Sequence, residues 1–159
     1  GTGYWPAIWS CGSKFEWPYN GEIDVMEYYG DAIHANVAWG GNKKWDAKCN
    51  SKAPRMSTFD SDFADKYHVW RMEWTNESIK IYVDDRLLNN IDLDQTVNGN
   101  PQSEYFNLDG YNPYRDPEQL HGVWLNLALG GDNGGPLADT PFPAQYYVDY
   151  VRVYVPAGN

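Results

Sequence analysis

The sequence predicts an all-β fold, either a β-sandwich or a jelly roll, and three observations support this class. Apolar and polar side chains alternate with the period of a strand along most of the chain. No stretch of ten residues carries the apolar stripe of a helix. The short strand-like runs are separated by turns and loops rich in Gly, Pro, Asn and Asp, which is typical of sandwiches.

Length and composition limit what the protein can be. The chain has 159 residues, the size of one domain, so we expect a single domain over residues 1–159. Aromatic residues make up 16% of it, which excludes a disordered chain. The net charge is −10, whereas surfaces that bind phosphates carry clustered Lys and Arg. No apolar run approaches the ~18 residues of a membrane span. We therefore expect neither a nucleic acid nor a membrane as partner.

The middle of the chain predicts a meander of antiparallel strands. Residues 68–74 alternate, and a polar turn over 75–78 leads into a second strand at 79–83. A tight turn at Asp84-Asp85 then leads into a third strand at 86–91. Before the meander, residues 59–66 are expected to form one or two helical turns.

The last third of the chain predicts two more strands and two loops. Residues 121–129 form an apolar run long enough for a strand buried on both faces. Residues 145–155 alternate again and predict a final strand. Between the strands lie a long loop at 92–118 and a Gly- and Pro-rich connector at 130–143. A loop as long as the first is usually functional in a compact β domain.

The most informative segment is an acidic strand near the N-terminus. Glu22, Asp24 and Glu27 fall within six residues, and the apolar residues between them make the reverse face resemble a core face. On a regular strand Glu22 and Asp24 share one face while Glu27 points to the other. One extra residue between Asp24 and Glu27, a β-bulge, would return all three carboxylates to a single face.

Carboxylates gathered on one face suggest a catalytic role, because like charges repel and their proximity needs a reason. Two carboxylic acids on either side of a glycosidic bond can act as nucleophile and acid/base. The alternative is a set of ordinary charges on a solvated face. Tryptophans near this segment favour the glycosidase, because flat aromatic rings stack on sugars, although we expect at least two of them to be core residues. These tryptophans are Trp5, Trp9, Trp17, Trp39 and Trp45.

Beyond these local features, the sequence resembles glycoside hydrolase family 16, the superfamily of laminarinases, lichenases, agarases and carrageenases. The resemblance rests on blocks in family order at 5–9, 21–28, 68–74, 81–85, 125–131 and 148–154. The acidic block, Gly-Glu-Ile-Asp-Val-Met-Glu-Tyr, is the specific one. The resemblance implies a jelly-roll sandwich of two antiparallel sheets with a concave substrate cleft. It also implies a secreted endo-hydrolase (extracellular, periplasmic or at the cell surface) that acts on a β-linked polysaccharide with retention.

The resemblance assigns roles to the three carboxylates. Glu22 matches the nucleophile, Glu27 the acid/base, and Asp24 the carboxylate between them. The nucleophile must be ionised while the acid is protonated, so their environments must separate the two pKa values. We expect Asp24 to hold Glu22 by a hydrogen bond and to keep Glu27 protonated by repulsion.

Further positions match other functional residues of the family. Trp17 matches a sugar-stacking tryptophan, and Trp5 and Trp9 match positions along the cleft. His34 and Asn126 correspond to polar groups near the reacting sugar. Outside the cleft, Asp149 matches a residue that in many members helps to bind a structural calcium. No cofactor is expected for catalysis itself.

The spacing of the acidic block also narrows the substrate. Glu-x-Asp-x-x-Glu resembles the laminarinase, agarase and carrageenase branches, and the neighbouring Trp-Pro-Ala-Ile-Trp block favours an endo-β-1,3-glucanase. Two alternatives stay open. One is an endo-hydrolase of a red-algal galactan, because five basic residues cluster at Lys43, Lys44, Lys48, Lys52 and Arg55. The other is a non-catalytic β-glucan-binding protein, although such a protein would normally have lost one of the two glutamates.

Two questions concern how the fold is held together. Members of the family carry several strands before the Trp-Pro-Ala block, which here begins at Trp5. We expect those strands to come from a preceding segment, from a separate chain or from a swapped copy, the alternative being a minimal sandwich that folds alone. Cys11 and Cys49 are either joined in a disulfide or free.

Overall fold

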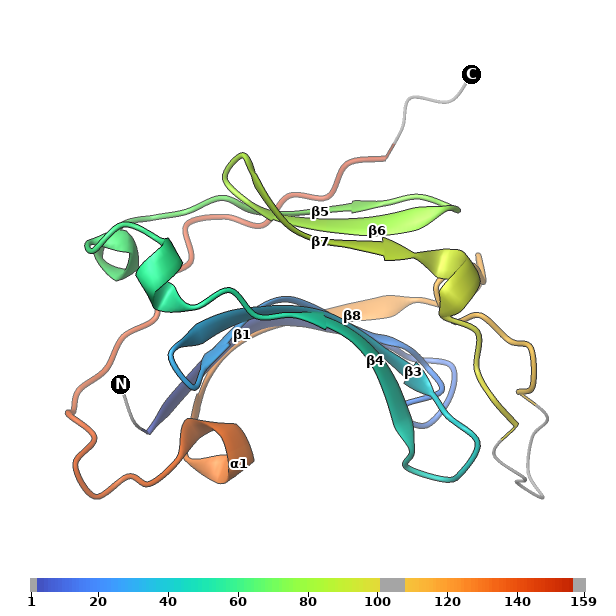
Figure 1. The fold of residues 1–159 in the computed structure, drawn as a ribbon, viewed down its shortest axis with the longest axis horizontal. Coiled ribbons are helices and arrows are strands. Elements are labelled where there is room, and N and C mark those ends of the chain that lie inside the picture. The colour runs from blue at the N-terminus through green and yellow to red at the C-terminus, as the bar shows by residue number, and fades with distance from the viewer. Residues whose placement is uncertain (1–2, 101–107, 156–159) are drawn as a thin grey trace.

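The fold consists of two antiparallel β-sheets packed face to face (Figure 1), as the computed structural model describes it for residues 3–100 and 108–155. The larger sheet has the order β4-β3-β2-β1-β8 and the smaller one the order β5-β6-β7. The strands are β1 (Tyr4–Gly12), β2 (Glu22–Tyr29), β3 (Ala32–Gly40), β4 (Ala47–Lys52), β5 (Trp70–Trp74), β6 (Ser78–Val83), β7 (Arg86–Asp92) and β8 (His121–Leu129). The prediction of an all-β fold of two antiparallel sheets is therefore confirmed.

Helical structure in the described residues is limited to single turns. Three 3₁₀ turns cover Met56–Thr58, Phe63–Asp65 and Leu93–Gln95, and the four-residue helix α1 covers Gly131–Gly134. The turn at Phe63–Asp65 lies where helical turns were expected before the meander. No helix in the described part of the chain is long and apolar enough to cross a membrane.

The meander β5-β6-β7 forms as predicted, and its alternation explains the core. On β6 every second residue is buried, and Ile79 and Ile81 are fully enclosed. They pack against apolar side chains that point inward from the larger sheet, such as Ile23 and Val37. Side chains that alternate along both sheets thus fill one apolar layer between them.

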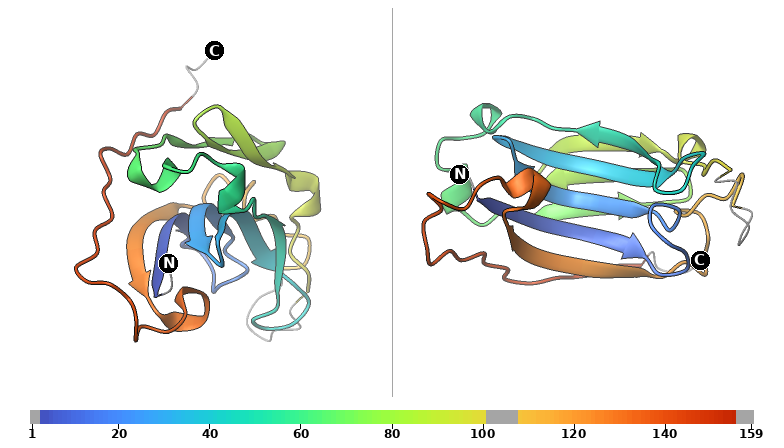
Figure 2. Two further views of the ribbon diagram at one scale, coloured as in Figure 1. Left: turned by 60° about the vertical axis from the view of Figure 1, so that its left-hand side comes forward. Right: turned by 90° about the horizontal axis from the view of Figure 1, so that it is seen from below.

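The larger sheet is strongly curved and has one concave face (Figure 1). In Figure 1 its strands arch with the convex side toward β5–β7, while the concave side stays uncovered. The view from below in Figure 2 shows the strands of this concave sheet side by side. Because β2 is the middle strand and pairs with β1 and β3, whatever its outward-facing side chains do takes place at the centre of the concavity.

The expectation that strand 121–129 is buried on both faces is wrong, although β8 has the predicted bounds. Among the described strands it lies at the edge of the larger sheet, where it pairs with β1 alone. On its reverse face Val123 is 56% exposed and Leu125 is 40% exposed. The physical reason is the position of the smaller sheet, which packs on β2, β3 and β4 rather than on β8.

The strand predicted at 145–155 does not form in the described structure. The segment has strand-like alternation, but it is not part of either sheet and most of its side chains are exposed. A strand is defined by hydrogen bonds to a neighbour, and no strand of the described residues pairs with this segment. Whether strands from another segment or chain complete the fold stays a prediction.

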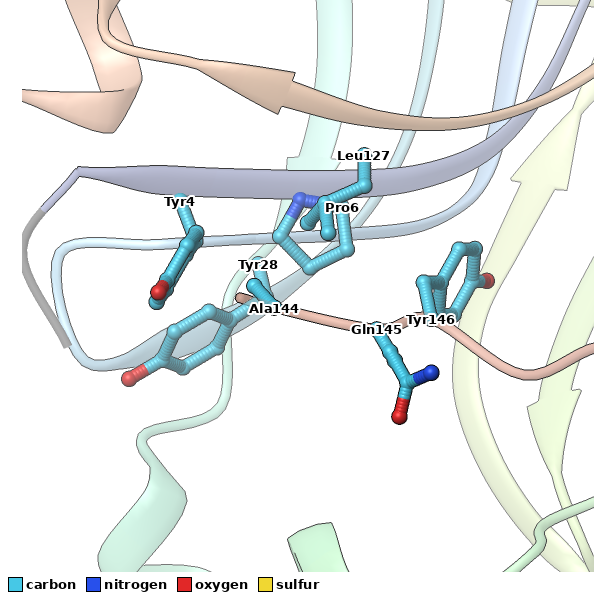
Figure 3. A pocket seen from close by; sticks show the side chains of 7 residues that line it. All are labelled: Tyr4, Pro6, Tyr28, Leu127, Ala144, Gln145 and Tyr146. Atoms are coloured by element: carbon cyan, nitrogen blue, oxygen red, sulfur yellow. The ribbon is translucent and has the colours of Figure 1, made fainter. Parts of the chain in front are cut away.

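Where this C-terminal segment passes β1, its side chains close only part of the space. A cavity of about 220 Å³ remains there (Figure 3). Its lining is mainly apolar and aromatic, with Tyr4, Tyr28 and Leu127 on the sheet side and Tyr146 on the segment. The hydroxyl groups of Tyr4 and Tyr146 are buried without a hydrogen-bond partner in the described residues. The segment is therefore attached by side-chain packing instead of a strand ladder.

The packing between the sheets leads to a stability prediction. Ile81→Ala should lower the free energy of unfolding by about 2–5 kcal/mol, because it removes a fully buried side chain from the core. Leu87→Ala on β7 is the control, since Leu87 is 49% exposed, and it should cost less than about 1 kcal/mol. Urea unfolding of the two variants checks this, and equal losses would contradict the assignment of the core.

Candidate active site

The acidic strand β2 contains the predicted bulge. Along β3, Asn36 lies opposite Asp24 and His34 lies opposite Glu27, so two steps on β3 face three steps on β2. The pairing with β1 shows the same irregularity. One extra residue therefore lies between Asp24 and Glu27, and the prediction of a β-bulge there is confirmed.

The bulge determines which way the carboxylates point. Val25 and Met26 are consecutive, yet both belong to the buried core. Glu27 is thereby returned to the concave face, and Glu22 and Glu27 line the same cavity. Asp24 lies between them and is 6% exposed. Three carboxyl groups are thus brought together on one side of a strand whose other side is apolar.

Each outer carboxylate accepts a hydrogen bond from a tryptophan. Trp17 donates its indole N–H to Oε2 of Glu22 at 2.5 Å, and Trp5 donates to Oε1 of Glu27 at 2.9 Å. An indole N–H can only donate, so both bonds favour the ionised form of the carboxyl group. Both tryptophans were predicted in the cleft, and the structure places them there.

Two hydrogen-bonded polar side chains on β3 and β4 extend to the same group of carboxylates. Asn36 donates a hydrogen bond from its Nδ2 to Oε2 of Glu27 at 3.3 Å. Its Oδ1 accepts a hydrogen bond from the hydroxyl of Ser51. Neither residue was among the sequence candidates. The alternation of strand side chains contained the signal for Asn36, because it follows the predicted His34 by two positions and so shares its face.

Burial raises the pKa of all three carboxyl groups, but not equally. Burial and then the charges of Glu27 and Glu22 raise the pKa of Asp24 to about 9, so Asp24 holds a proton at neutral pH. For Glu22, burial raises the pKa, the bond from Trp17 lowers it, and the charge of Glu27 raises it. For Glu27, burial raises the pKa, and the bonds from Trp5 and Asn36 oppose this.

These causes correct the expected role of Asp24. Repulsion by Asp24 was expected to keep Glu27 protonated, yet the pKa of Glu27 is raised first of all by burial. Asp24 is the most buried of the three groups and itself takes the proton, so at neutral pH it is uncharged and does not repel the other two.

The cavity beside the carboxylates has a volume of about 280 Å³ and crosses three strands. Trp5 and Trp9 flank it, while the small side chains of Ala7 and Ala128 leave room between them. Trp9 donates its indole N–H to Oδ1 of Asn126 at 2.7 Å. The complete lining is Trp5, Ala7, Trp9, Glu22, Glu27, Asn126 and Ala128.

The structure separates the remaining tryptophans and places His34. Trp39 is a core residue, whereas Trp45 is exposed on the loop between β3 and β4. The expectation of at least two core residues among the five tryptophans is therefore wrong, because Trp5, Trp9 and Trp17 lie at the cleft and Trp45 lies on a loop. His34 stacks on Tyr29 at 3.7 Å between ring centroids, and burial lowers its pKa, so it is neutral beside Glu27.

The predicted calcium site is not supported by the residues around Asp149. Asp149 lies exposed on the segment that joins neither sheet. The described residues contain no group of three or more His, Cys, Asp or Glu side chains that could hold a metal ion. Ca²⁺ binds 6–8 oxygen ligands, so the described surroundings of Asp149 do not fit this ion.

The basic cluster lies largely away from the cleft. Lys48 pairs across the sheet with Trp39, and Lys52 pairs with Ala35, both of which point into the core. Directly paired residues share a face, so Lys48 and Lys52 point away from the carboxylates. Lys44 forms an exposed ion pair with Glu16. The cluster therefore gives little support to a cleft for a sulfated galactan.

The two cysteines are free, and both lie on the cleft face of the sheet. Cys11 is opposite Glu22, and Cys49 is opposite Ala38, which itself faces Glu22 from the other side. Three strand spacings of about 4.8 Å separate the two cysteines, which is too far for a disulfide.

A tyrosine from the long loop supports the acidic strand from behind. Tyr114 is buried, and its hydroxyl lies 2.9 Å from the carbonyl oxygen of Glu22 and 2.5 Å from that of Ala38. Gly21, just before Glu22, has a positive φ of 76°, and a side chain there would collide with Pro113. No local pattern marked Tyr114, because its partner strand is about ninety residues away.

Comparison with known proteins places this geometry in a family. The model of the family Glycosyl hydrolases family 16 matches residues 1–113. A Rhodothermus marinus protein named beta-glucanase is 36% identical over 97% of this chain and 53% of its own length. The X-ray structure of an endo-beta-1,3-glucanase from Pyrococcus furiosus has a TM-score of 0.62 and 31% identity over 90% of this chain and 52% of that chain.

A further solved structure comes from work on endo-acting O-glycanases of the human gut microbiota that initiate mucin breakdown. It has a TM-score of 0.67 and 29% identity, and the match covers 90% of this chain and 49% of that chain. The chain thus spans about half the length of the proteins described in these comparisons.

The buried carboxyl groups predict that stability depends on pH. A raised pKa for Asp24 means that the folded protein keeps a proton that the unfolded chain loses above pH ~4, so stability falls as pH rises toward 9. Asp24→Asn should flatten this dependence and reduce the loss between pH 5 and pH 8 by at least about 1 kcal/mol. Urea unfolding of both proteins at the two pH values measures the effect. An unchanged slope would show that Asp24 ionises normally.

Proposed function

Since this chain belongs to glycosyl hydrolase family 16, we propose that it carries the catalytic cleft of a retaining endo-β-1,3-glucanase. The observation that supports this most directly is the position of Glu22 and Glu27 on one face of β2, lining one tryptophan-flanked cavity. Retaining glycosidases use such a pair of carboxyl groups as nucleophile and acid/base. The substrate lies outside the cell, so we also propose that the protein is secreted.

In the first step Glu27 donates its proton to the glycosidic oxygen while the carboxylate of Glu22 attacks the anomeric carbon. The bond to the leaving sugar breaks, and a covalent ester between the sugar and Glu22 forms. Burial raises the pKa of Glu22, and the hydrogen bond from the indole N–H of Trp17 opposes this by favouring the ionised form that attacks. Burial favours the protonated form of Glu27 that the step requires.

In the second step Glu27, now ionised, takes a proton from water, and the water oxygen attacks the anomeric carbon. The ester bond breaks, Glu22 leaves as a carboxylate, and the product keeps the configuration of the substrate. The hydrogen bond from Trp5 keeps Glu27 in place for both proton transfers. Asp24, neutral between the two, adds no second negative charge beside the nucleophile.

A second candidate is an endo-glycanase acting on mucin O-glycans or on a galactan. The likeness to a structure from work on mucin O-glycanases favours the first substrate, and the orientation of Lys48 and Lys52 disfavours a sulfated galactan. A non-catalytic glucan-binding protein is a third candidate. The intact pair of glutamates with its matched indole donors argues against it.

The function is tested by the release of new reducing ends. The protein should cleave laminarin faster than lichenan, agarose, carrageenan or mucin O-glycans. Glu22→Gln should abolish nearly all turnover and still bind oligosaccharides, because the amide cannot form the glycosyl ester. Glu27→Gln should lose turnover of substrates with poor leaving groups, and added azide should partly restore turnover of substrates with good leaving groups. Parent-level activity in Glu22→Gln would exclude it as the nucleophile.

Tyr114 provides a second test through its contact with the backbone of the nucleophile. Tyr114→Phe keeps the buried ring but removes the hydroxyl between the carbonyl groups of Glu22 and Ala38. We expect kcat on laminarin to fall about 3- to 10-fold with KM nearly unchanged, because one hydrogen bond of about 0.5–1.5 kcal/mol positions Glu22. Tyr111→Phe on the same loop is the control, because its hydroxyl donates to Asp116 and not to the backbone of the acidic strand, and it should leave kcat unchanged. An unaltered kcat in Tyr114→Phe would show that the hydroxyl only contributes to packing.

A further inference from the structure

Trp124 on the edge strand β8 lies on the cleft face, outside the set of residues that the sequence suggested. It pairs across the sheet with Trp9, and it precedes the cavity-lining Asn126 by two positions. Both relations place its side chain on the concave face. Trp124 is 54% exposed, an unusual state for the largest apolar side chain.

The ring of Trp124 is held in a defined position. It stacks on Trp9 with 5.5 Å between ring centroids and 21° between ring planes. Trp9 is fixed in turn by its hydrogen bond to Asn126 at 2.7 Å. The stack covers one side of Trp124, and more than half of the residue's surface stays open to solvent. The two rings form a rigid aromatic wall that spans two strands.

This wall is one side of a groove that runs across the strands. Trp5 flanks the other side. The ring of Tyr29 packs edge-on against the ring of Trp5, with 6.1 Å between the ring centroids. Ala7 lies between the two sides and Ala128 lies beside Trp5, and these small side chains keep the groove open. From β2 through β1 to β8 the groove crosses two strand spacings, about 10 Å, which is comparable to the length of a disaccharide.

We propose that Trp124 and Trp9 form a sugar-binding subsite on the β8 side of the catalytic carboxylates, where Trp124 stacks on an uncharged pyranose of the β-glucan chain. This inference rests on the proposed function and specifies where the substrate chain leaves the catalytic centre. An uncharged sugar is favoured because the residues that line the groove include two glutamates and no basic side chain. The stacking face is apolar and flat, which suits the C–H face of a pyranose and not a charged group.

The subsite is tested by binding of laminarihexaose to the inactive Glu22→Gln protein. Adding Trp124→Ala should weaken binding about 2- to 12-fold, the range expected for one aromatic stacking contact. Trp124→Leu keeps apolar bulk on the strand but removes the flat ring, and it should weaken binding to a similar extent. Trp124→Phe should retain most of the affinity. Val123→Ala is the matched control, because Val123 is 56% exposed on the other face of the same strand, and it should leave binding unchanged.

The outcomes separate this inference from the proposed function. Binding by Trp124→Leu as tight as that of the Glu22→Gln parent would overturn the subsite and leave the enzyme assignment intact. Equal weakening by Val123→Ala would also overturn it, because the effect would then come from the edge strand and not from stacking. If the Glu22→Gln parent itself does not bind laminarihexaose, the β-1,3-glucan function fails, and the glucan subsite fails with it.

Discussion

The structure is organised around the burial of three carboxyl groups on one face of β2. Removing like charges from water is costly unless protons or donors compensate them. Here Asp24 holds a proton, while Trp17 and Trp5 donate to Glu22 and Glu27. The bulge makes this arrangement possible, because it turns two consecutive apolar residues into the core and brings Glu27 back to the cleft.

The precise placement of these groups depends on support from behind the strand. Because β2 is the central strand, it is paired on both sides, and its apolar face is covered by the smaller sheet. The described part of the 92–118 loop adds Tyr114, whose hydroxyl lies against the backbone of Glu22. From the same loop Asn98 bonds to the backbone of Gly40 and Tyr19, which joins the end of β3 to the loop before β2. The 92–118 loop therefore contributes to the position of Glu22.

At the β8 edge of the larger sheet, the concave face and the reverse face have different roles. On the concave face β8 supplies Asn126 and Trp124 to the groove, while its reverse face exposes Val123 and Leu125. The groove thus extends onto an edge strand. There the stack of Trp9 and Trp124 supplies rigidity that pairing with a second strand would otherwise provide.

The sequence by itself determined the β class, the meander, the bulge and the shared face of the three carboxylates. These features follow from the two-residue period of a strand, which is a local property. The tertiary structure alone decided that β8 is an edge strand, that residues 145–155 join neither sheet, and that Trp39 belongs to the core while Trp5 and Trp9 belong to the cleft. It also decided which carboxyl group holds the proton. These outcomes depend on contacts between distant segments, such as Trp9 with Asn126, and on the burial those contacts produce, neither of which a local pattern contains.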